Sequence, residues 1–380
     1  MGDYVRQMPH QGSHDMARRP SAAMRFHIDV PLLLLLIALT VYGLFVLYSA
    51  SGQNMGAVIR QGRYFIVAYG IMILGAQVSL QRYMRWAPWF YLLGIASLVA
   101  VMLVGVGAKG AQRWLEIGGF RFQPSEIMKL LVPMALAWYL ADRILPPRLN
   151  SVLIALVLVG IPSVLILQQP DLGTALLIAA SGLFVLFVAG IGWRYIFGAV
   201  ILAAASAWPA WMFVLKDYQK QRILTMLNPE TDKLGAGWNI IQSKTAIGSG
   251  GWSGKGWMKG TQSQLDFLPE SHTDFIIAVL AEEYGLRGIL MLMGIYLLIL
   301  LRGFWIGIRA QTSFGRMMAG SLTLTFFVYI FVNMGMVAGL LPVVGVPLPL
   351  VSAGGTSVVT LMAGFGVMMA VSTEKRMVAH

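Results

Sequence analysis

The sequence predicts an all-α, polytopic membrane protein with about ten transmembrane helices. Of its 380 residues, 57% are hydrophobic and only 12% are charged, which is typical of membrane proteins rather than of soluble domains. The mean hydropathy of +0.72 agrees with this class. The apolar residues are also gathered into runs of roughly 20, the length that a helix needs to cross a bilayer.

Ten apolar runs divide the chain. The first continues from Ile28 to about Ala50, which is long enough to span and does not read as a cleavable signal peptide. Residues 1–27 are polar and lack apolar periodicity, so we expect a disordered cytoplasmic tail, then one membrane domain over 28–371 and a cytoplasmic C-terminal tail over 372–380. The fifth and sixth runs lie so close together that a re-entrant pair is an alternative. The predicted spans are 28–50, 63–80, 87–106, 124–141, 150–167, 172–190, 193–215, 274–301, 316–340 and 352–371.

The distribution of basic residues predicts the orientation of these spans. With the amino terminus inside, the cytoplasmic segments hold fourteen Lys and Arg residues against five in the short outer loops, as the positive-inside rule requires. We therefore place both termini in the cytoplasm and the long loop 216–273, between the seventh and eighth helices, outside. The net charge of +12 then indicates topology and anionic inner-leaflet lipid rather than a nucleic-acid partner. The short outer loops carry only Arg60, Arg63, Lys109, Arg113 and Arg121.

Carboxylates gather at the outer end of the eighth predicted helix, in the stretch "SHTDFIIAVLAEEYGLR". We expect a helix from Asp274 to Leu301, which is too long for the hydrocarbon core, so that Asp274 lies at the rim of an outward cavity. Within this helix, Glu283 and Arg287 have the i, i+4 spacing of an ion pair.

Two interpretations of Asp274 remain open on these residues alone. Ser271 and Asp274 match a capping box, which would make the aspartate part of a helix cap. A carboxylate at a cavity edge can instead act as a general base on an alcohol. His272 is the only histidine outside the tails, and one imidazole cannot build a metal site, so we expect it to position substrate.

Charged residues in or beside other spans form a second group of candidates. Glu126 and Lys129 lie i, i+3 on one face of the fourth span, either as a neutralised pair with Lys129 reaching outward or as a site for the diphosphate of a lipid-linked sugar. Arg113 would be a second cation for that diphosphate. Asp171 either caps the sixth span through the N–H of Thr174 or supports the site.

Two irregular segments lie beside the eighth and tenth spans. The stretch "AIGSGGWSGKGWMKG" is not a phosphate-binding loop, because Ser249 stands where that motif requires a glycine and Gly256 where it requires Ser or Thr. Its glycines instead predict tight turns and close backbone approach to a bulky ligand. The stretch "LLPVVGVPLPLVSAGG" predicts broken backbone that is buried or lines a cavity.

Several motifs resemble the SEDS family (shape, elongation, division and sporulation). They occur in the family's order across nearly all of the chain after residue 27, and "GKGWMKGTQSQLDFLPE" resembles the elongation branch more than the division branch. Ala353 departs from the family, which has an aromatic residue there, and the difference concerns the packing of that loop. The motifs are "AQRWL", "FQPSEIMKL", "QPDLGTALL", "LPESHTDFIIAVLAEE" and "NMGMVAGLLPVVGVPLPLVSAGG".

The resemblance implies a peptidoglycan glycosyltransferase of the bacterial cytoplasmic (inner) membrane, with its active site on the extracytoplasmic side. Such an enzyme polymerises lipid II during cell elongation and releases undecaprenyl diphosphate. It works with a class B penicillin-binding protein, a transpeptidase like penicillin-binding protein 2, and with other proteins of the elongation complex. The resemblance also implies that Asp274 is catalytic and that Glu126 and Lys129 are functionally sensitive.

Together these arguments give a hypothesis for the reaction. Asp274 is the general base of a single, inverting displacement that forms a β-1,4 glycosidic bond. The other site residues bind or orient the substrate and its departing diphosphate, which needs positive charge. They are Lys129, Glu126, Arg113, Asp171 and His272.

The sequence requires no cofactor. It contains no cysteine, which excludes thiolate chemistry, and it shows no dedicated metal site, although a divalent cation such as Mg²⁺ or Mn²⁺ could share the neutralisation of the diphosphate. Two other functions stay open as alternatives. One is a transporter, or flippase, of the lipid-linked precursor, and the other is a non-catalytic scaffold of the cell-wall machinery.

Overall fold

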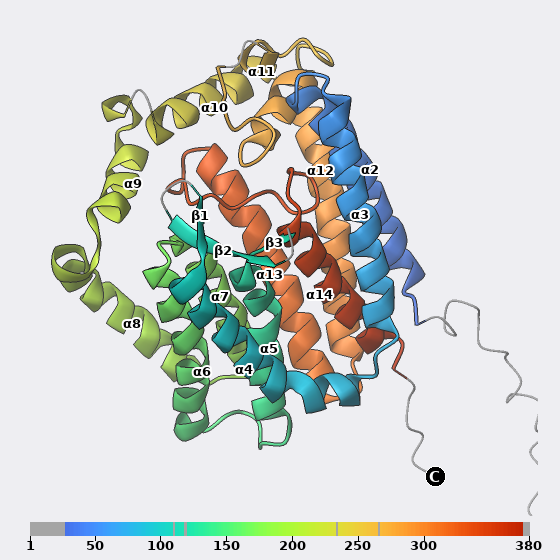
Figure 1. Ribbon diagram of the computed structural model, residues 1–380, viewed down its shortest axis with the longest axis vertical. Helices are drawn as coiled ribbons and strands as arrows, with labels where there is room; N and C mark the ends of the chain where they lie inside the picture. Colours follow the sequence, from blue (N-terminus) through green and yellow to red (C-terminus); the bar gives the residue numbers. More distant parts are fainter. Residues whose placement is uncertain (1–26, 109–110, 118–119, 233–234, 265–266, 375–380) are drawn as a thin grey trace, which may run out of the picture.

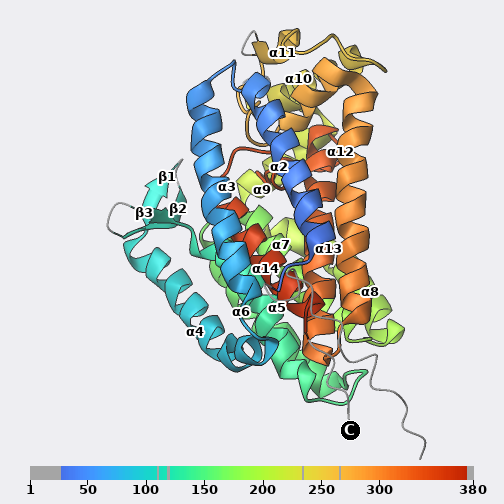
Figure 2. The same cartoon turned by 90° about the vertical axis from the view of Figure 1, so that its right-hand side faces the viewer.

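The computed structural model describes residues 27–108, 111–117, 120–232, 235–264 and 267–374. Of the two predicted tails, only residue 27 and residues 372–374 belong to this part of the chain, so the prediction for the rest of each tail lies outside the described residues. The described helices form an elongated bundle, shown from two sides in Figure 1 and Figure 2.

Ten long apolar helices make up the bundle, and each coincides with one of the ten predicted spans. Their boundaries differ from the predicted ones mainly at α3 and α4, which both begin several residues earlier, and at α12. Within the described residues the helices are α2 (Val30–Ala50), α3 (Met55–Ala76), α4 (Leu80–Val104), α5 (Pro124–Ala141), α6 (Leu149–Gln168), α7 (Leu172–Val188), α8 (Trp193–Pro209), α12 (Ile276–Arg309), α13 (Ser313–Val337) and α14 (Thr356–Ser372).

Seven helices of the described residues are long and apolar enough to cross a membrane, by length and composition alone. Two more, α7 and α14, are apolar but shorter, with 17 residues each. The tenth, α5, has 18 residues and carries the charged Glu126 and Lys129. The predicted class of an all-α, polytopic membrane protein is confirmed, and α6 and α7 are two separate helices joined at 169–171.

The segments between the spans hold more structure than the sequence predicts. A small antiparallel sheet of β1 (Val106–Ala108), β2 (Ala111–Ile117) and β3 (Phe120–Phe122) joins α4 to α5. The predicted loop 216–273 contains three helices, α9 (Asp217–Leu227), α10 (Ala236–Gly250) and α11 (Thr261–Gln264). This segment between the seventh and eighth spans is thus largely helical, with α10 and α11 at the upper end of the bundle and α9 along its left side in Figure 1.

Helix α13 occupies the centre of the bundle, where it packs against α5, α7, α12 and α14. Its buried residues include Thr325, Tyr329 and Asn333. Because these three residues are spaced four apart, they share one side of the helix. Helix α8, in contrast, has no buried residue and extends away from the other helices in Figure 1. The bundle thus has a polar stripe along its central helix.

Helix α12 is interrupted where the sequence predicts continuous helix. It begins at Ile276 rather than Asp274, and Gly285 within it has φ 63° and ψ −157°. The glycine loop, residues 251–256, inserts beside this break, and the N–H groups of Lys255 and Gly256 donate to the carbonyls of Glu282 and Glu283, each at 3.0 Å. An unpaired carbonyl in a bilayer costs several kcal/mol, so the inserted loop is what makes the break tolerable.

The glycines of this region allow the glycine loop and α10 to pack directly against the backbone of α12. A Cβ on Gly250 would overlap the carbonyl oxygen of Ala281, and a Cβ on Gly254 would overlap that of Glu283. The predicted close backbone approach is confirmed, and the backbone that is approached is that of α12. Glycine is required because only the missing side chain lets two backbones meet at this distance.

The carboxylates of Glu282 and Glu283 are both buried beside the break. Glu282 accepts hydrogen bonds from the Lys255 ammonium at 2.6 Å and from the backbone N–H of Thr261 at 2.8 Å, while Glu283 accepts one from the Ser49 hydroxyl. The predicted pair between Glu283 and Arg287 is wrong, since the break at Gly285 removes the helical spacing and Arg287 lies exposed.

Another buried carboxylate, that of Asp29, ties three helices together at the opposite end of the bundle. Asp29 caps α2 by accepting from the N–H of Leu32, and it also accepts from both Nε and Nη2 of Arg302 in α12 and from the hydroxyl of Ser372 in α14. Burial raises the pKa of Asp29, but the hydrogen bonds from Arg302 and Ser372 outweigh burial and hold that pKa below its usual value.

We predict that Gly250→Ala lowers the free energy of unfolding by about 1–3 kcal/mol, because the added methyl group forces two backbones apart. Gly248→Ala is the matched control, since no atom lies within 4 Å of a Cβ at that position in the same helix. That change removes a helix-interior glycine and should stabilise by up to about 1 kcal/mol. Thermal unfolding of the full chain in detergent measures both, and equal midpoints would contradict the packing argument.

We predict that Asp29→Asn lowers the thermal midpoint at pH 7, because it removes the charge that Arg302 and Ser372 hold. A carboxyl whose folded pKa is depressed stabilises the fold fully above its unfolded pKa of about 3.9, and this contribution is lost as the pH falls through the lower folded value. The difference between wild type and variant should therefore narrow below about pH 4. A difference that stays constant down to the lowest pH would show that the charge of Asp29 does not stabilise the fold.

Candidate active site

Asp274 lies in a series of turns that precede α12, and it does not cap that helix. The predicted capping box is wrong, because the N–H of Ser271 donates to the carbonyl of Leu268 at 3.1 Å and its hydroxyl to the carbonyl of Ala50 at 3.1 Å. Helix α12 starts only at Ile276, where Phe275 is the N-cap without a side-chain hydrogen bond. The bond to Ala50 comes from α2, a partner that local sequence rules cannot include.

The backbone carbonyls of the HTD segment, residues 272–274, accept hydrogen bonds from a single neighbouring region. This region combines α13 with the proline segment, residues 338–355, which follows it. The N–H of Ala353 donates to the carbonyl of His272 at 3.0 Å, and the amide of Asn333 donates to the carbonyl of Asp274 at 2.9 Å. Asp274 is half-buried and His272 is exposed. The proline segment and α13 thus support the backbone of the candidate base through hydrogen bonds.

The proline segment also approaches the Asp274 carboxylate itself. Gly345 has a φ of 74°, and a Cβ placed on it would lie 3.7 Å from Oδ2 of Asp274. The expectation that this broken backbone is buried or lines a cavity agrees with the burial of Val346, Leu348 and Ser352. The irregular stretch therefore borders the candidate catalytic group.

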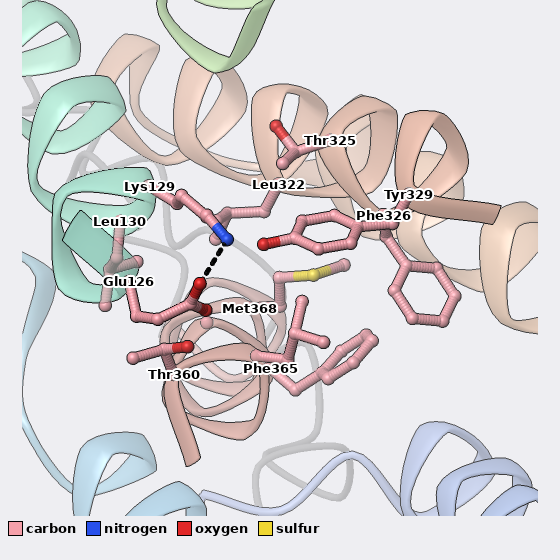
Figure 3. Close-up of a pocket in the computed structure, with 12 residues that line it drawn as sticks. Glu126, Lys129, Leu130, Leu322, Thr325, Phe326, Tyr329, Thr360, Phe365 and Met368 are labelled. Carbon is pink, nitrogen blue, oxygen red and sulfur yellow. Dashed lines mark hydrogen bonds and ion pairs between the residues drawn. The ribbon is translucent and has the colours of Figure 1, made fainter. Parts of the chain in front are cut away.

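Glu126 and Lys129 form the predicted pair, with 2.6 Å between Oε1 and Nζ. Their side chains are each 9% exposed, and Nζ lies 4.8 Å from the centre of the Tyr329 ring. Figure 3 shows the Tyr329 hydroxyl pointing toward this ammonium. Lys129 does not reach outward, because α5, α13 and α14 enclose it. The alternative of an outward lysine is wrong.

A cavity of about 30 Å³ adjoins this pair. It is lined by residues of α5, α13 and α14, among them Glu126, Lys129, Thr325 and Tyr329 (Figure 3). Such a volume holds a water molecule rather than a sugar or a diphosphate. Two buried atoms on its wall, Oε2 of Glu126 and Oγ1 of Thr325, have no hydrogen-bond partner within the described part of the chain, which fits an internal water.

Arg113 and Asp171 form a second polar pair. The Arg113 guanidinium in β2 lies 3.8 Å from Oδ2 of Asp171 and donates to the carbonyls of Gln169 and Pro170. Asp171 accepts from the N–H of Thr174 at 3.1 Å, so its predicted role as a helix cap is confirmed. Arg113 is thus bound by Asp171, while Glu126 binds Lys129.

The two pairs meet at the start of α5. Gln123, the residue before that helix, donates to Oδ2 of Asp171 at 3.3 Å, and Glu126 lies in the first turn that follows. The small sheet places Arg113 here by folding back over the turn between α6 and α7. The structure thus brings Glu126 to Lys129 and Arg113 to Asp171, while Asp274 and His272 lie on the segment before α12.

Sequence reasoning did not single out Asn333, Ser352 or Tyr329. All three are buried polar side chains that contact the HTD segment or Lys129. Asn333 could have been found as a polar residue within an apolar span, because polar side chains inside membranes are costly and indicate a structural or functional role. No group of three His, Asp or Glu side chains fit to hold a metal ion occurs among the described residues.

Comparison with known proteins identifies the family. Residues 30–377 match the family of cell cycle proteins designated FtsW, RodA and SpoVE. The chain belongs to this SEDS family. Its sequence is 54% identical over 355 residues to the peptidoglycan glycosyltransferase MrdB of Escherichia coli K12, which covers 93% of this chain and 96% of that protein. It is 37% identical over 360 residues to a probable peptidoglycan glycosyltransferase FtsW of Geobacter metallireducens, covering 92% and 95%.

Solved structures of SEDS proteins share the fold. One is the crystal structure of the Thermus thermophilus rod shape determining protein RodA, with a TM-score of 0.69, 27% identity and coverage of 90% of this chain and 96% of that chain. Another is a chain of a peptidoglycan synthase complex that coordinates polymerization and crosslinking, with a TM-score of 0.78, 30% identity and coverage of 90% and 97%. The resemblance to the elongation branch is confirmed, since the identity to MrdB, a RodA protein, exceeds that to the FtsW protein.

We predict that Lys129→Met or Glu126→Gln alone destabilises this SEDS protein by about 3–5 kcal/mol, because each leaves its partner buried without a compensating charge or hydrogen bond. The double variant removes both charges and should regain most of the loss. Thermal unfolding in detergent measures all three, with Lys259→Met as the control at an exposed lysine. Additive losses in the double variant would show that the two side chains do not act as a pair.

Proposed function

We propose that the chain polymerises lipid II into β-1,4-linked glycan strands during cell elongation, with Asp274 as the general base. The class of enzyme follows from the family: the chain is a peptidoglycan glycosyltransferase, 54% identical to one over 93% of its length. This identity, which extends over nearly the whole chain, favours the enzyme over the transporter and the scaffold. The observation that carries the assignment of the base is structural. Asp274 does not serve as a cap for α12, and the segment that bears it is bonded to the proline segment and α13.

In the proposed reaction, Asp274 accepts the proton of the 4-hydroxyl of the acceptor's GlcNAc. The same oxygen attacks the anomeric carbon of the donor's MurNAc, and the bond from that carbon to the diphosphate breaks. Undecaprenyl diphosphate leaves as an anion, so no acid is needed to protonate it, and the α-linked donor becomes a β-linked product. Asp274 then passes its proton to solvent. One base and charge stabilisation of the leaving group suffice for this single displacement.

The leaving diphosphate needs positive charge, and we assign Arg113 and Lys129 to this role. The side chain of Arg113 is 31% exposed, and its partner Asp171 lies at 3.8 Å, so the guanidinium can also engage an incoming phosphate. Lys129 would reach a diphosphate only if α5, α13 and α14 separated, because the cavity beside it is about 30 Å³. Glu126 and Asp171 hold these cations in place, and the exposed His272 binds substrate next to the base.

A divalent cation is an optional part of the proposal. Mg²⁺ or Mn²⁺ would be bound mainly by the diphosphate oxygens and would share in their neutralisation. The described residues offer no ready-made site of three His, Asp or Glu ligands for a resident ion. The side chains named above are therefore the ones on which we rely for catalysis.

The chain is a multi-pass membrane protein, and its finer placement belongs to this proposal. We place the membrane domain, 28–371, in the bacterial cytoplasmic membrane, with cytoplasmic tails and with Asp274 on the extracytoplasmic side. We also propose a class B penicillin-binding protein, similar to penicillin-binding protein 2, as the partner, together with other elongation-complex proteins. A related chain in a complex that coordinates polymerization with crosslinking supports a transpeptidase partner.

We predict that Asp274→Asn lowers glycan synthesis by roughly 10²–10⁴-fold, the usual contribution of a general base. The assay is polymerisation of lipid II by the purified chain with its penicillin-binding partner, whose transpeptidase is blocked. Asp217→Asn, an exposed aspartate in the first turn of α9, should stay within about twofold of wild type, since surface substitutions have little effect.

Equal synthesis by wild type and Asp274→Asn would place the base elsewhere, with Glu126 and Asp171 as the next candidates. A wild-type complex that made no polymer but moved labelled lipid II across vesicles would favour the transporter. Full growth complementation by Asp274→Ala would favour the scaffold.

A further inference from the structure

A fully buried asparagine bonds the HTD segment to the proline segment. Asn333 lies in α13 and is 0% exposed, and its amide nitrogen donates to the carbonyl of Asp274 at 2.9 Å and to that of Val346 at 2.7 Å. Both amide hydrogens are thus given to backbone groups of two different segments. Two acceptors on one side also fix the orientation of the amide, since its oxygen could not donate to them.

This arrangement leaves the other half of the amide unsatisfied. Oδ1 of Asn333 is buried and has no hydrogen-bond partner among the residues that the structure describes. A buried acceptor without a partner costs about 1–3 kcal/mol, and asparagine is also a weaker helix former than leucine. Stability alone would favour an apolar residue here. Donation to the two carbonyls is therefore what the asparagine contributes.

Two further bonds from the proline segment fix the remaining carbonyls of the HTD segment. The hydroxyl of Ser352, which is 2% exposed, donates to the carbonyl of Thr273 and accepts from the N–H of Leu348. The N–H of Ala353 donates to the carbonyl of His272. Three successive carbonyls are thus bound from one region, so the peptide planes cannot rotate without breaking these bonds.

We propose that Asn333 is a positioning residue for the Asp274 base, and that Ser352 assists it through Thr273. The proposal rests on the catalytic role proposed for Asp274. The fixed peptide planes set the direction of the Cα–Cβ bond of Asp274, and thereby the place of its carboxylate beside Gly345. Catalytic groups have to be held within about 0.5 Å of their productive position, and a displacement of about 1 Å can cost 10²-fold in rate.

A reporter that does not depend on activity tests the position of residue 274. The chain contains no cysteine, so Asp274→Cys introduces its only thiol, to which a nitroxide spin label can be attached. In the full chain with its penicillin-binding partner, Asn333→Leu should increase the mobility of this label. Leucine has a similar volume but no donor, so the substitution removes the two hydrogen bonds and keeps the packing.

Ser321→Ala is the matched control. Ser321 is 0% exposed in the same helix, and its hydroxyl donates to the carbonyl of Ser181 at 2.7 Å, so the substitution also removes one buried bond to a backbone carbonyl. The label should keep its wild-type mobility in this background. Equal changes with Asn333→Leu and Ser321→Ala would overturn the proposal, because they would indicate a general loosening of the bundle.

Kinetics of the unlabelled complex provide the second readout. Asn333→Leu should lower kcat for lipid II polymerisation by roughly 100-fold while KM changes less than about threefold, since the base is displaced and the substrate contacts remain. Ser352→Ala removes one bond and should lower kcat by roughly tenfold. Ser352→Thr retains a hydroxyl and should restore most of the rate. Because Ser352→Ala is a small change, it keeps the test valid if Asn333→Leu does not fold.

Wild-type kcat and wild-type label mobility in Asn333→Leu and Ser352→Ala would overturn the positioning role. A lowered kcat with unchanged mobility would overturn it as well. The proposed function fails by a different result, full activity of Asp274→Asn. Full activity of that variant, with the label still loosened by Asn333→Leu, would mean that Asn333 holds the segment but not a base.

Discussion

In a bilayer every backbone N–H and C=O group has to find its partner within the protein, and the rest of this structure follows from how that requirement is met. The ten helices meet it internally. Two of the places where the chain departs from helix are the break in α12 and the proline segment, and both are bonded by backbone or side chains from other segments. At Gly285 the partner is the glycine loop, whose N–H groups bind the carbonyls that the break releases.

The second departure builds the candidate site. Ser352 and Ala353 of the proline segment and Asn333 of α13 donate hydrogen bonds to the carbonyls of the HTD segment. The proline segment thus supplies donors for carbonyls that no helix binds. Broken backbone is allowed here because it is paired and buried. The result is a rigid support for Asp274 that a continuous helix could not supply, since helical carbonyls are already bonded within the helix.

The charged pairs have different environments, and the difference bears on their roles. Glu126 and Lys129 are enclosed by three helices, where an unpaired charge is costly, so each requires the other. Arg113 is partly exposed at the edge of the bundle, with Asp171 at a longer distance. Arg113 is therefore the more accessible of the two cations. The enclosed pair instead connects α5 with α13, the helix that carries Asn333, through the contact between Lys129 and Tyr329.

The sequence by itself determined the features that depend on neighbours along the chain. The length of the apolar runs gave the ten helices, and spacings of three residues gave the cap at Asp171 and the pair of Glu126 with Lys129, because one helical turn places such residues together. Only the tertiary structure decided the rest. Ser271 has its partner in α2, Glu283 also has its partner in α2, and Asp274 is held by α13, all across large separations in sequence. The i, i+4 rule fails at Glu283 because its carboxylate accepts from Ser49 of a distant helix, and the capping box fails at Ser271 because the chain turns there and the N–H donates to the carbonyl of Leu268. Only the packed bundle reveals which bond forms.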